Sequence, residues 1–196
     1  MLGLAILKFS LIYLLFIMKA SANNLAADAI VPVSGTNMGA VETPSGNTRV
    51  YYQDSTNGSI VQLVISNALT EGGYVISNTW VPSKQVRYGS PVAVSTIPNG
   101  DAHYEEIHVF FFSPDNVLSE YYWKGNGPVG GPSCSDCVTN SGFVGVEGSQ
   151  MLYALASSDT SPPTLRVGFV SAGSPNTISE AVNTNGEWSV ASLTSA

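Results

Sequence analysis

The sequence predicts an all-β fold made of about three four-stranded blades of the β-propeller type. Two observations indicate that the fold is all-β. After residue 23 no segment has a sustained helical period, and short runs rich in Val, Tyr, Phe and Ile alternate with turn clusters of Gly, Pro, Asn, Asp and Ser. A third observation, one hairpin that recurs three times, indicates blades.

Eight segments have the length and composition of strands. They are residues 48–53, 59–65, 91–95, 107–112, 117–123, 150–155, 165–170 and 177–182. A half-solvated strand alternates apolar and polar residues, yet residues 109–112 are apolar or aromatic on both faces. Such strands are expected where blades pack between neighbouring blades.

The three hairpins align on Arg49, His108 and Arg166, at spacings of 59 and 58 residues. A strand of small residues precedes each hairpin, and an aromatic residue near glycine follows each one. Four short strands per unit are typical of a propeller blade. The predicted units cover about residues 36–88, 89–146 and 147–191. A β-sandwich whose strands resemble one another by chance is the alternative.

Each hairpin is expected to set a donor beside an acceptor across its two strands. Counting outward from the turn sequences gives three directly opposed pairs. They are Arg49 with Gln62, His108 with Glu120, and Arg166 with Glu180. A guanidinium beside a carboxylate can bridge neighbouring sugar hydroxyls, and an aromatic ring can cover the apolar face of the sugar. The alternative is an ion pair that only stabilises the hairpin.

Residues 49–53, 58–60, 178–180 and 186–188 resemble the blade repeat of the fungal fucose-specific lectins, and the resemblance covers about residues 36–191. It implies a six-bladed propeller, of which this chain holds about half. It also implies that an Arg on the second strand and a Glu on the third hold fucose, while an aromatic residue, often from the adjoining blade, packs on the sugar. No metal ion or cofactor is implied.

The resemblance ranks the three units as binding sites. The third unit matches best, with Arg166, Glu180 and Trp188. The first has Gln62 in place of the acid and the second has His108 in place of the Arg, so both lose charge-assisted hydrogen bonds and are expected to be weak, altered or empty. The candidate aromatic residues of these two units are Tyr74 or Trp80 in the first and Phe143 in the second.

A half-ring would leave apolar blade faces and strand edges exposed, which is unfavourable. Three arrangements avoid this. Two chains form a homodimer that closes one ring, the chain is a truncated product, or modified strands cover the faces.

Residues 1–22 are predicted to be a signal peptide, because an apolar run after Lys8 ends in the small-x-small pattern of residues 20–22. A membrane anchor is the alternative, and cleavage would leave no membrane span. Removing Lys8 and Lys19 leaves a formal net charge of 5 − 14 = −9. This charge argues against nucleic acid as a partner.

Cys134 and Cys137 are the only cysteines, and a secreted chain favours a local disulfide between them over a redox or zinc motif. Asn57 begins an N-glycosylation sequence in a predicted turn. Neither a nucleophile motif nor a metal-ligand set is found, and the cluster of His103, Glu105 and Glu106 is interpreted as a solvated rim, so an enzyme is not predicted.

The sequence therefore predicts a secreted, extracellular lectin that binds L-fucose or fucosylated glycans on glycoproteins. The alternative is a secreted structural or protein-interaction module that keeps the blades and has lost sugar binding.

Overall fold

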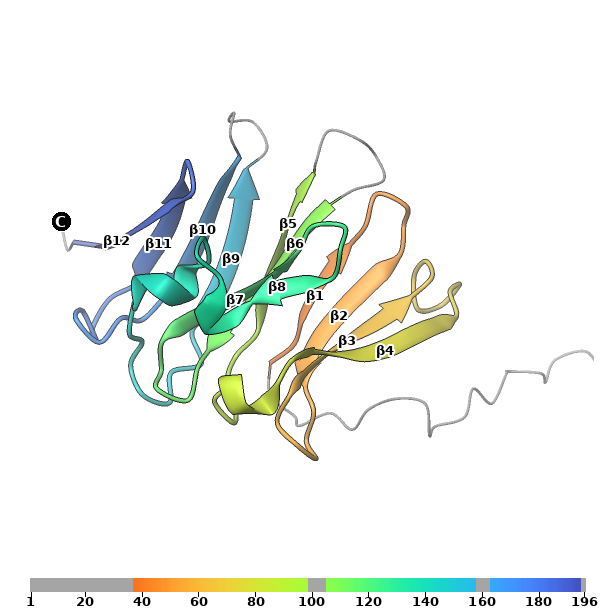
Figure 1. Ribbon diagram of the computed structural model, residues 1–196, viewed down its shortest axis with the longest axis horizontal. Coiled ribbons are helices and arrows are strands. Elements are labelled where there is room, and N and C mark those ends of the chain that lie inside the picture. Colours follow the sequence, from red (N-terminus) through yellow and green to blue (C-terminus); the bar gives the residue numbers. More distant parts are fainter. Residues whose placement is uncertain (1–36, 99–104, 158–162, 195–196) are drawn as a thin grey trace, which may run out of the picture. The chain divides into compact units, whose positions relative to one another are not determined.

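The computed structural model describes residues 37–98, 105–157 and 163–194, which form three four-stranded antiparallel sheets (Figure 1). Blade 1 contains β1 (Gly39–Glu42), β2 (Thr48–Gln53), β3 (Ile60–Ile65) and β4 (Tyr74–Val81). Blade 2 contains β5 (Ala93–Pro98), β6 (Glu105–Phe112), β7 (Leu118–Trp123) and β8 (Pro128–Gly130). Blade 3 contains β9 (Leu152–Ser157), β10 (Thr164–Phe169), β11 (Ser179–Thr184) and β12 (Glu187–Ser192). Short 3-10 helices lie at η2 (Ser83–Gln85), η3 (Gly131–Ser133) and η4 (Val138–Ser141).

The predicted fold class is confirmed, since each of the eight expected strands overlaps a strand of a four-stranded antiparallel blade. In each blade the strands lie in sequence order, so every connection within a blade is a hairpin. The predicted signal peptide lies outside the described residues. Within the part of the chain that the structure describes, no helix is long and apolar enough to cross a membrane.

Blade 2 is apolar on both faces because it packs between the other two blades. Ile107, Val109 and Phe111 of β6 join a core cluster with blade 1, while Phe110 and Phe112 join a second cluster with blade 3. All five side chains are at most 4% exposed. The run of β-branched and aromatic residues in β6 thus reflects two interblade cores rather than one buried face.

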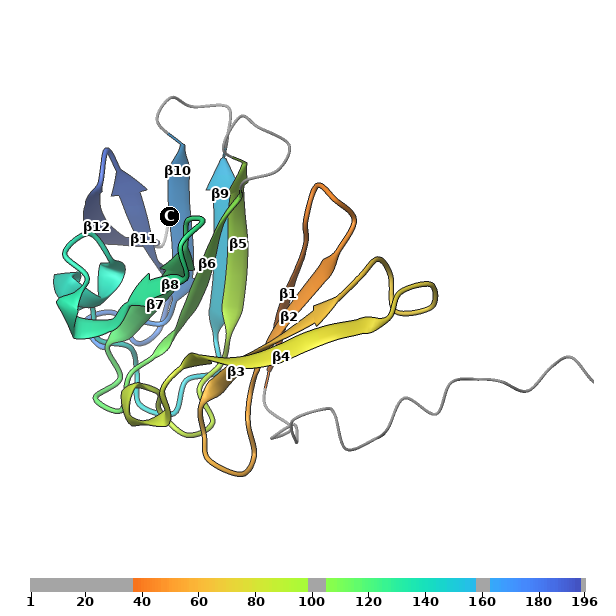
Figure 2. The same ribbon diagram turned by 45° about the vertical axis from the view of Figure 1, so that its right-hand side comes forward.

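The first strands of the blades lie side by side, with β5 between β1 and β9 (Figure 2). Gly39 in β1 permits close approach, because a Cβ atom placed there would lie 2.5 Å from Val94 Cγ2 of β5. This packing explains why β1 carries a glycine where it meets β5.

The connections between blades are fixed by Arg87, for which the sequence suggested no role. Its guanidinium donates to Asn116 Oδ1 at 2.7 Å, in the central turn of blade 2, and to the Ser149 carbonyl oxygen at 2.6 Å, in the segment that leads to blade 3. The guanidinium carbon also lies 5.0 Å from the ring centroid of Phe112. One side chain therefore ties together three segments that are distant in sequence.

The predicted register of the hairpins is wrong by the same amount in each blade. Arg49 lies opposite Val64, His108 opposite Tyr122, and Arg166 opposite Val182. The hairpins of blades 1 and 2 are centred one residue later than predicted, and Gly58 and Asn116 adopt left-handed φ values of 79° and 58° where their turns end. Gln62, Glu120 and Glu180 consequently lie diagonal to their expected partners, on the same face of the sheet.

Candidate functional site

The three candidate pairs occupy equivalent places on the blades. The face of each blade that carries its pair is called here the leading face, and the opposite face is called the trailing face. In blades 1 and 2 the leading face packs on the trailing face of the next blade. In blade 3 the leading face holds the solvent-exposed Arg166, so the three pairs have different surroundings.

Arg166 and Glu180 form a two-point ion pair on the leading face of blade 3. The Arg166 Nε atom donates to Glu180 Oε1 at 2.8 Å, and its second terminal nitrogen donates to Oε2 at 3.0 Å. Their side chains remain 50% and 24% exposed. The hydrogen bonds from Arg166 lower the pKa of Glu180, so the carboxylate is ionised at neutral pH. Arg166 and Glu180 were expected to lie directly opposite each other. They lie diagonally across the two strands instead, and their long side chains still reach one another.

Tyr153 belongs to the same site, although the sequence analysis did not select it. Its hydroxyl donates to Glu180 Oε2 at 3.0 Å. The ring lies over Gly168, where an added Cβ atom would be 2.0 Å from Tyr153 Cε1. In blades 1 and 2 the first strand carries the small residue at this position and the second strand carries the large one. Gly39 lies opposite Tyr51, and Ala93 lies opposite Phe110. The aromatic residue among the small residues of β9 and the matching Gly in β10 were the signal that could have identified it.

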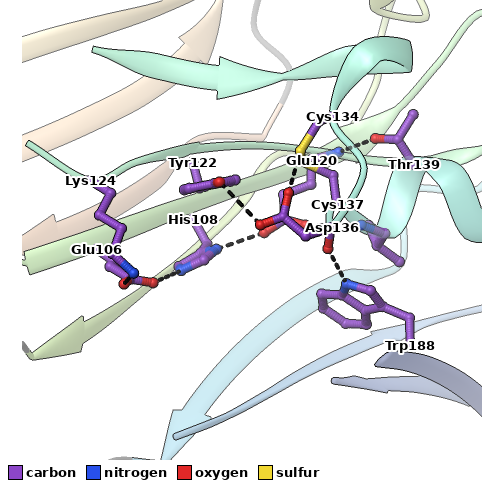
Figure 3. A network of polar contacts seen from close by, with 11 residues as sticks. Glu106, His108, Glu120, Tyr122, Lys124, Cys134, Asp136, Cys137, Thr139 and Trp188 are labelled. Carbon is purple, nitrogen blue, oxygen red and sulfur yellow. Dashed lines mark hydrogen bonds and ion pairs between the residues drawn. A yellow bond between two sulfur atoms is a disulfide. The ribbon is translucent and has the colours of Figure 1, made fainter. Parts of the chain in front are cut away.

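The pair in blade 2 is buried and has no free hydrogen-bonding groups on its imidazole. His108 Nδ1 lies 2.6 Å from Glu120 Oε1, and His108 Nε2 lies 3.4 Å from Glu106 Oε2 (Figure 3). Glu120 Oε2 accepts the backbone N–H of Val138 at 3.0 Å. His108 is 5% exposed and Glu120 is 2% exposed. Because the neighbouring groups use these atoms, the pair offers few donors or acceptors to a ligand.

Glu106 corrects the interpretation of the acidic cluster near residue 105 as a solvated rim. Its carboxylate contacts His108 and also Lys124 Nζ, at 2.5 Å, and its side chain is only 18% exposed. The hydrogen bond with His108 is the largest cause that lowers the pKa of Glu106 to about 2. Glu106 is therefore part of the blade 2 network, while His103 lies outside the described residues.

A cleft of about 640 Å³ opens above the His108 pair, between blades 2 and 3. Trp188 of β12 lines one wall and Tyr122 of β7 lies on the other. Asp136 links the two, since Trp188 Nε1 donates to its carbonyl oxygen at 3.1 Å and the Tyr122 hydroxyl donates to Oδ2 at 3.2 Å (Figure 3). The grouping of Trp188 with Arg166 was wrong, because Trp188 packs on the trailing side of blade 3 and faces the pair of blade 2.

Blade 1 does not form the expected contact between Arg49 and Gln62. Gln62 instead donates its Nε2 to the Tyr51 hydroxyl at 2.6 Å. The Arg49 Nε atom is buried without a hydrogen-bond partner. Trp80 is 5% exposed and packs edge-on against Tyr51 in the core between blades 1 and 2, so it is a core residue and not an open platform for a sugar.

Tyr74 and Phe143, the other aromatic candidates, differ in position. Tyr74 lies opposite Ile65 at the start of β4 and is half-buried. Phe143 follows η4, outside the four strands of blade 2, and packs at the edge of the core between blades 2 and 3. Pro128 of β8 takes the register position in blade 2 that Trp188 has in blade 3, so the first interblade interface has no aromatic residue there.

The predicted disulfide between Cys134 and Cys137 is confirmed. It joins η3 to η4 and brackets Asp136, whose side chain and carbonyl contact the two walls of the cleft. The side chains of Cys134, Asp136 and Cys137 lie close enough to hold an ion. Both sulfurs are bonded to each other, so this group lacks the thiolate ligands of a zinc site.

The network around His108 predicts a loss of stability at alkaline pH. Burial by itself would lower the pKa of His108, but the bonds to Glu106 and Glu120 outweigh it and the net pKa is raised. A raised pKa contributes stability that is complete below the unfolded value of about 6.5 and is lost as the pH rises through the folded value. We expect the melting temperature to fall above about pH 7 and this fall to be smaller in His108→Gln. Equal slopes in both proteins between pH 6 and 9 would contradict the assignment.

Solved lectin structures match this fold. The six-bladed β-propeller lectin of Aleuria aurantia, described with a novel fucose recognition mode, aligns with a TM-score of 0.64 and 23% identity over 83% of this chain and 50% of that chain. A mutant of that lectin in complex with Fucα1-6GlcNAc aligns with a TM-score of 0.63 and 25% identity over the same shares. The chain thus spans about half the length of the Aleuria lectin.

The fucose lectin of Kordia zhangzhouensis, solved with methyl-fucoside, aligns with a TM-score of 0.55 and 16% identity over 81% of this chain and 100% of that chain. No protein-family model and no curated protein sequence matches the chain. The structural neighbours are fucose-specific lectins with the β-propeller fold, and three blades of this chain match half of the six-bladed ring.

Proposed function

We propose that this protein is a lectin that binds L-fucose or fucosylated glycans through the leading face of blade 3. The observation that carries the proposal is the exposed two-point contact between Arg166 and Glu180. Blade 2 has a buried pair at the equivalent place, and blade 1 has Arg49, whose buried Nε atom has no hydrogen-bond partner.

The chemistry of this pair suits a neutral sugar. A guanidinium holds its donors in a fixed fork, and the carboxylate beside it supplies acceptors, so adjacent hydroxyls can bond to both at once. Tyr153 is 39% exposed and Leu155 is 48% exposed on the same face, which offers apolar surface to the C–H face or the methyl group of fucose. No metal ion is required for these contacts.

The other two blades are proposed to contribute little to fucose binding. Blade 2 uses its His and Glu atoms within the protein, and blade 1 lacks both the acid and the pairing. The cleft beside Trp188 keeps an aromatic wall but has no free Arg at its base. Binding is therefore expected to depend on one blade of the three.

A glycan array tests the proposed function. The labelled full chain is expected to bind fucosylated glycans and to ignore the same glycans without fucose. Retention of no fucosylated glycan would reject the lectin proposal and favour the alternative, a structural or protein-interaction module. The observation that favours the alternative is the buried pair in blade 2. His108 and Glu120 are buried there, so this blade keeps its fold without an open sugar site.

We also propose that the chain is secreted and that Asn57 is glycosylated. Asn57 is exposed in the turn between β2 and β3, in the sequence Asn-Gly-Ser. Expression in a eukaryotic secretory host should give a chain whose mass falls after treatment with an N-glycosidase. Asn57→Gln should remove this shift if the turn is the modified site. An unchanged shift would exclude Asn57.

A further inference from the structure

We propose that the disulfide between Cys134 and Cys137 is a redox-sensitive latch. In the oxidised chain it holds residues 131–141, called here the latch segment, over the buried pair of blade 2. Reduction of the disulfide releases the segment and opens the pair to the cleft between blades 2 and 3. This inference goes beyond the proposed function, because the proposed fucose site lies on the other face of blade 3.

The latch segment stands where blade 2 lacks most of an outer strand. β8 has three residues, whereas β4 has eight and β12 has six. β8 covers β7 only at residues 121–123. At Glu120 the latch segment covers β7 instead, since the Glu120 backbone N–H donates to Thr139 Oγ1 at 2.9 Å. The segment consists of the short 3-10 helices η3 and η4 and the link between them, and the hydrogen bonds of 3-10 turns have poor geometry. Its position therefore depends on contacts other than a strand ladder.

The latch segment covers the buried pair from two directions. The Val138 N–H donates to Glu120 Oε2 at 3.0 Å, and the Val138 side chain is completely buried in the core between blades 2 and 3. On the cleft side, Asp136 accepts hydrogen bonds from the Tyr122 hydroxyl and from Trp188 Nε1 (Figure 3). The burial of the pair thus depends on where Asp136 and Val138 lie.

The disulfide fixes the position of both residues. Asp136 lies between the two cysteines in the sequence, and Cys137 directly precedes Val138. The cross-link therefore limits the conformations of the backbone that carries Asp136 and the Val138 N–H. Cys134 and Cys137 are 4% and 2% exposed, while Ser135 and Asp136 are exposed, so the sulfurs lie just below the surface of the loop.

Reduction needs an external dithiol, which exchanges with the disulfide in two steps. A thiolate of the reductant attacks one cysteine sulfur and forms a mixed disulfide, and its second thiolate then displaces that sulfur and closes the oxidised reductant. The reductant loses two electrons, and its two thiol protons go to Cys134 and Cys137. The backbone between the cysteines then regains its freedom. Opening also returns water to the charges of the buried pair, which relieves their desolvation.

Amide hydrogen exchange followed by mass spectrometry tests the latch. The two cysteines are the only ones in the chain, so dithiothreitol has a single target. We expect exchange in residues 131–141 to become roughly tenfold faster after reduction and to slow again after reoxidation, with β2 and β3 of blade 1 unchanged. Equal exchange in the oxidised and reduced chains would overturn the latch. Faster exchange in blade 1 as well would also overturn it, because the disulfide would then hold the whole fold.

The accessibility of His108 is a second readout. Diethyl pyrocarbonate modifies accessible imidazoles, and peptide mass distinguishes His108 from the one other histidine of the chain. Modification of His108 should be roughly tenfold faster in the reduced chain. The double variant Cys134→Ser, Cys137→Ser should react at the fast rate with or without dithiothreitol. Unchanged protection of His108 in the reduced wild-type chain, or an effect of dithiothreitol that persists in the double variant, would refute the latch.

Discussion

Arg166→Ala is expected to weaken the binding of a fucoside by roughly 100-fold, with no change in the melting temperature. The substitution removes the donors that, in the proposed site, would meet the sugar hydroxyls. It also leaves Glu180 with only the bond from Tyr153. Arg166 is half-exposed and lies outside both apolar cores, so folding should be unaffected. Calorimetric titration with α-methyl-fucoside measures the affinity.

Two matched variants separate the role of Arg166 from a general effect of lost charge. Arg166→Lys keeps the charge but loses the planar fork, so an intermediate affinity is expected. Arg49→Ala removes the equivalent residue of blade 1, where Gln62 is hydrogen-bonded to Tyr51 instead, and it should leave fucoside binding within about twofold. A loss in Arg49→Ala as large as in Arg166→Ala would contradict the proposal that binding depends on blade 3 alone.

Glu120→Ala is expected to lower the free energy of unfolding by about 3–5 kcal/mol, the range found when one partner of a buried ion pair is removed. Glu120 is 2% exposed and holds His108 Nδ1 at 2.6 Å. Its loss would leave the imidazole with Glu106 alone and the Val138 N–H without a partner. Urea unfolding followed by tryptophan fluorescence measures the change.

Glu180→Ala is the control for this prediction, since it deletes the acid at the equivalent place in blade 3. The pair there is exposed to solvent, which screens the charges, so the stability should change far less than in Glu120→Ala. Fucoside binding should show the opposite order, with Glu180→Ala the more damaging variant. If Glu180→Ala destabilised the fold as much as Glu120→Ala, the pair in blade 3 would be structural and the division of roles between the blades would be wrong.

Much of the fold could be predicted from the sequence because blade strands are short, apolar on both faces and separated by strong turn residues. The residues that distinguish one blade from another, Arg49, His108 and Arg166, were aligned correctly, since they share a register position in the three hairpins. The predicted register was wrong, because in each hairpin the residue opposite Arg49, His108 or Arg166 lies two positions later in the sequence than expected. Turn composition locates a turn but does not fix which of its residues, such as Gly58 or Asn116, adopt positive φ.

The make-up of each site could not be predicted because it depends on which face of a blade meets which neighbour. Trp188 and Arg166 are close in the sequence yet lie on opposite sides of blade 3. The Tyr153 hydroxyl can bond to Glu180 only because Gly168 has no side chain and leaves room for the tyrosine ring. The large residue on β9 is thus matched by a glycine on β10. The burial of His108 between Glu106 and Glu120 likewise arises from packing against blade 3 and the segment at Val138.

The most direct test of the central claim is the stoichiometry of α-methyl-fucoside binding to the wild-type chain, measured by calorimetric titration. The account predicts one high-affinity site per chain, because only Arg166 and Glu180 present an exposed charged pair among the three candidate pairs. It also predicts that this site disappears in Arg166→Ala and persists in His108→Gln. Three equivalent sites per chain, or a site that survives Arg166→Ala, would contradict the account.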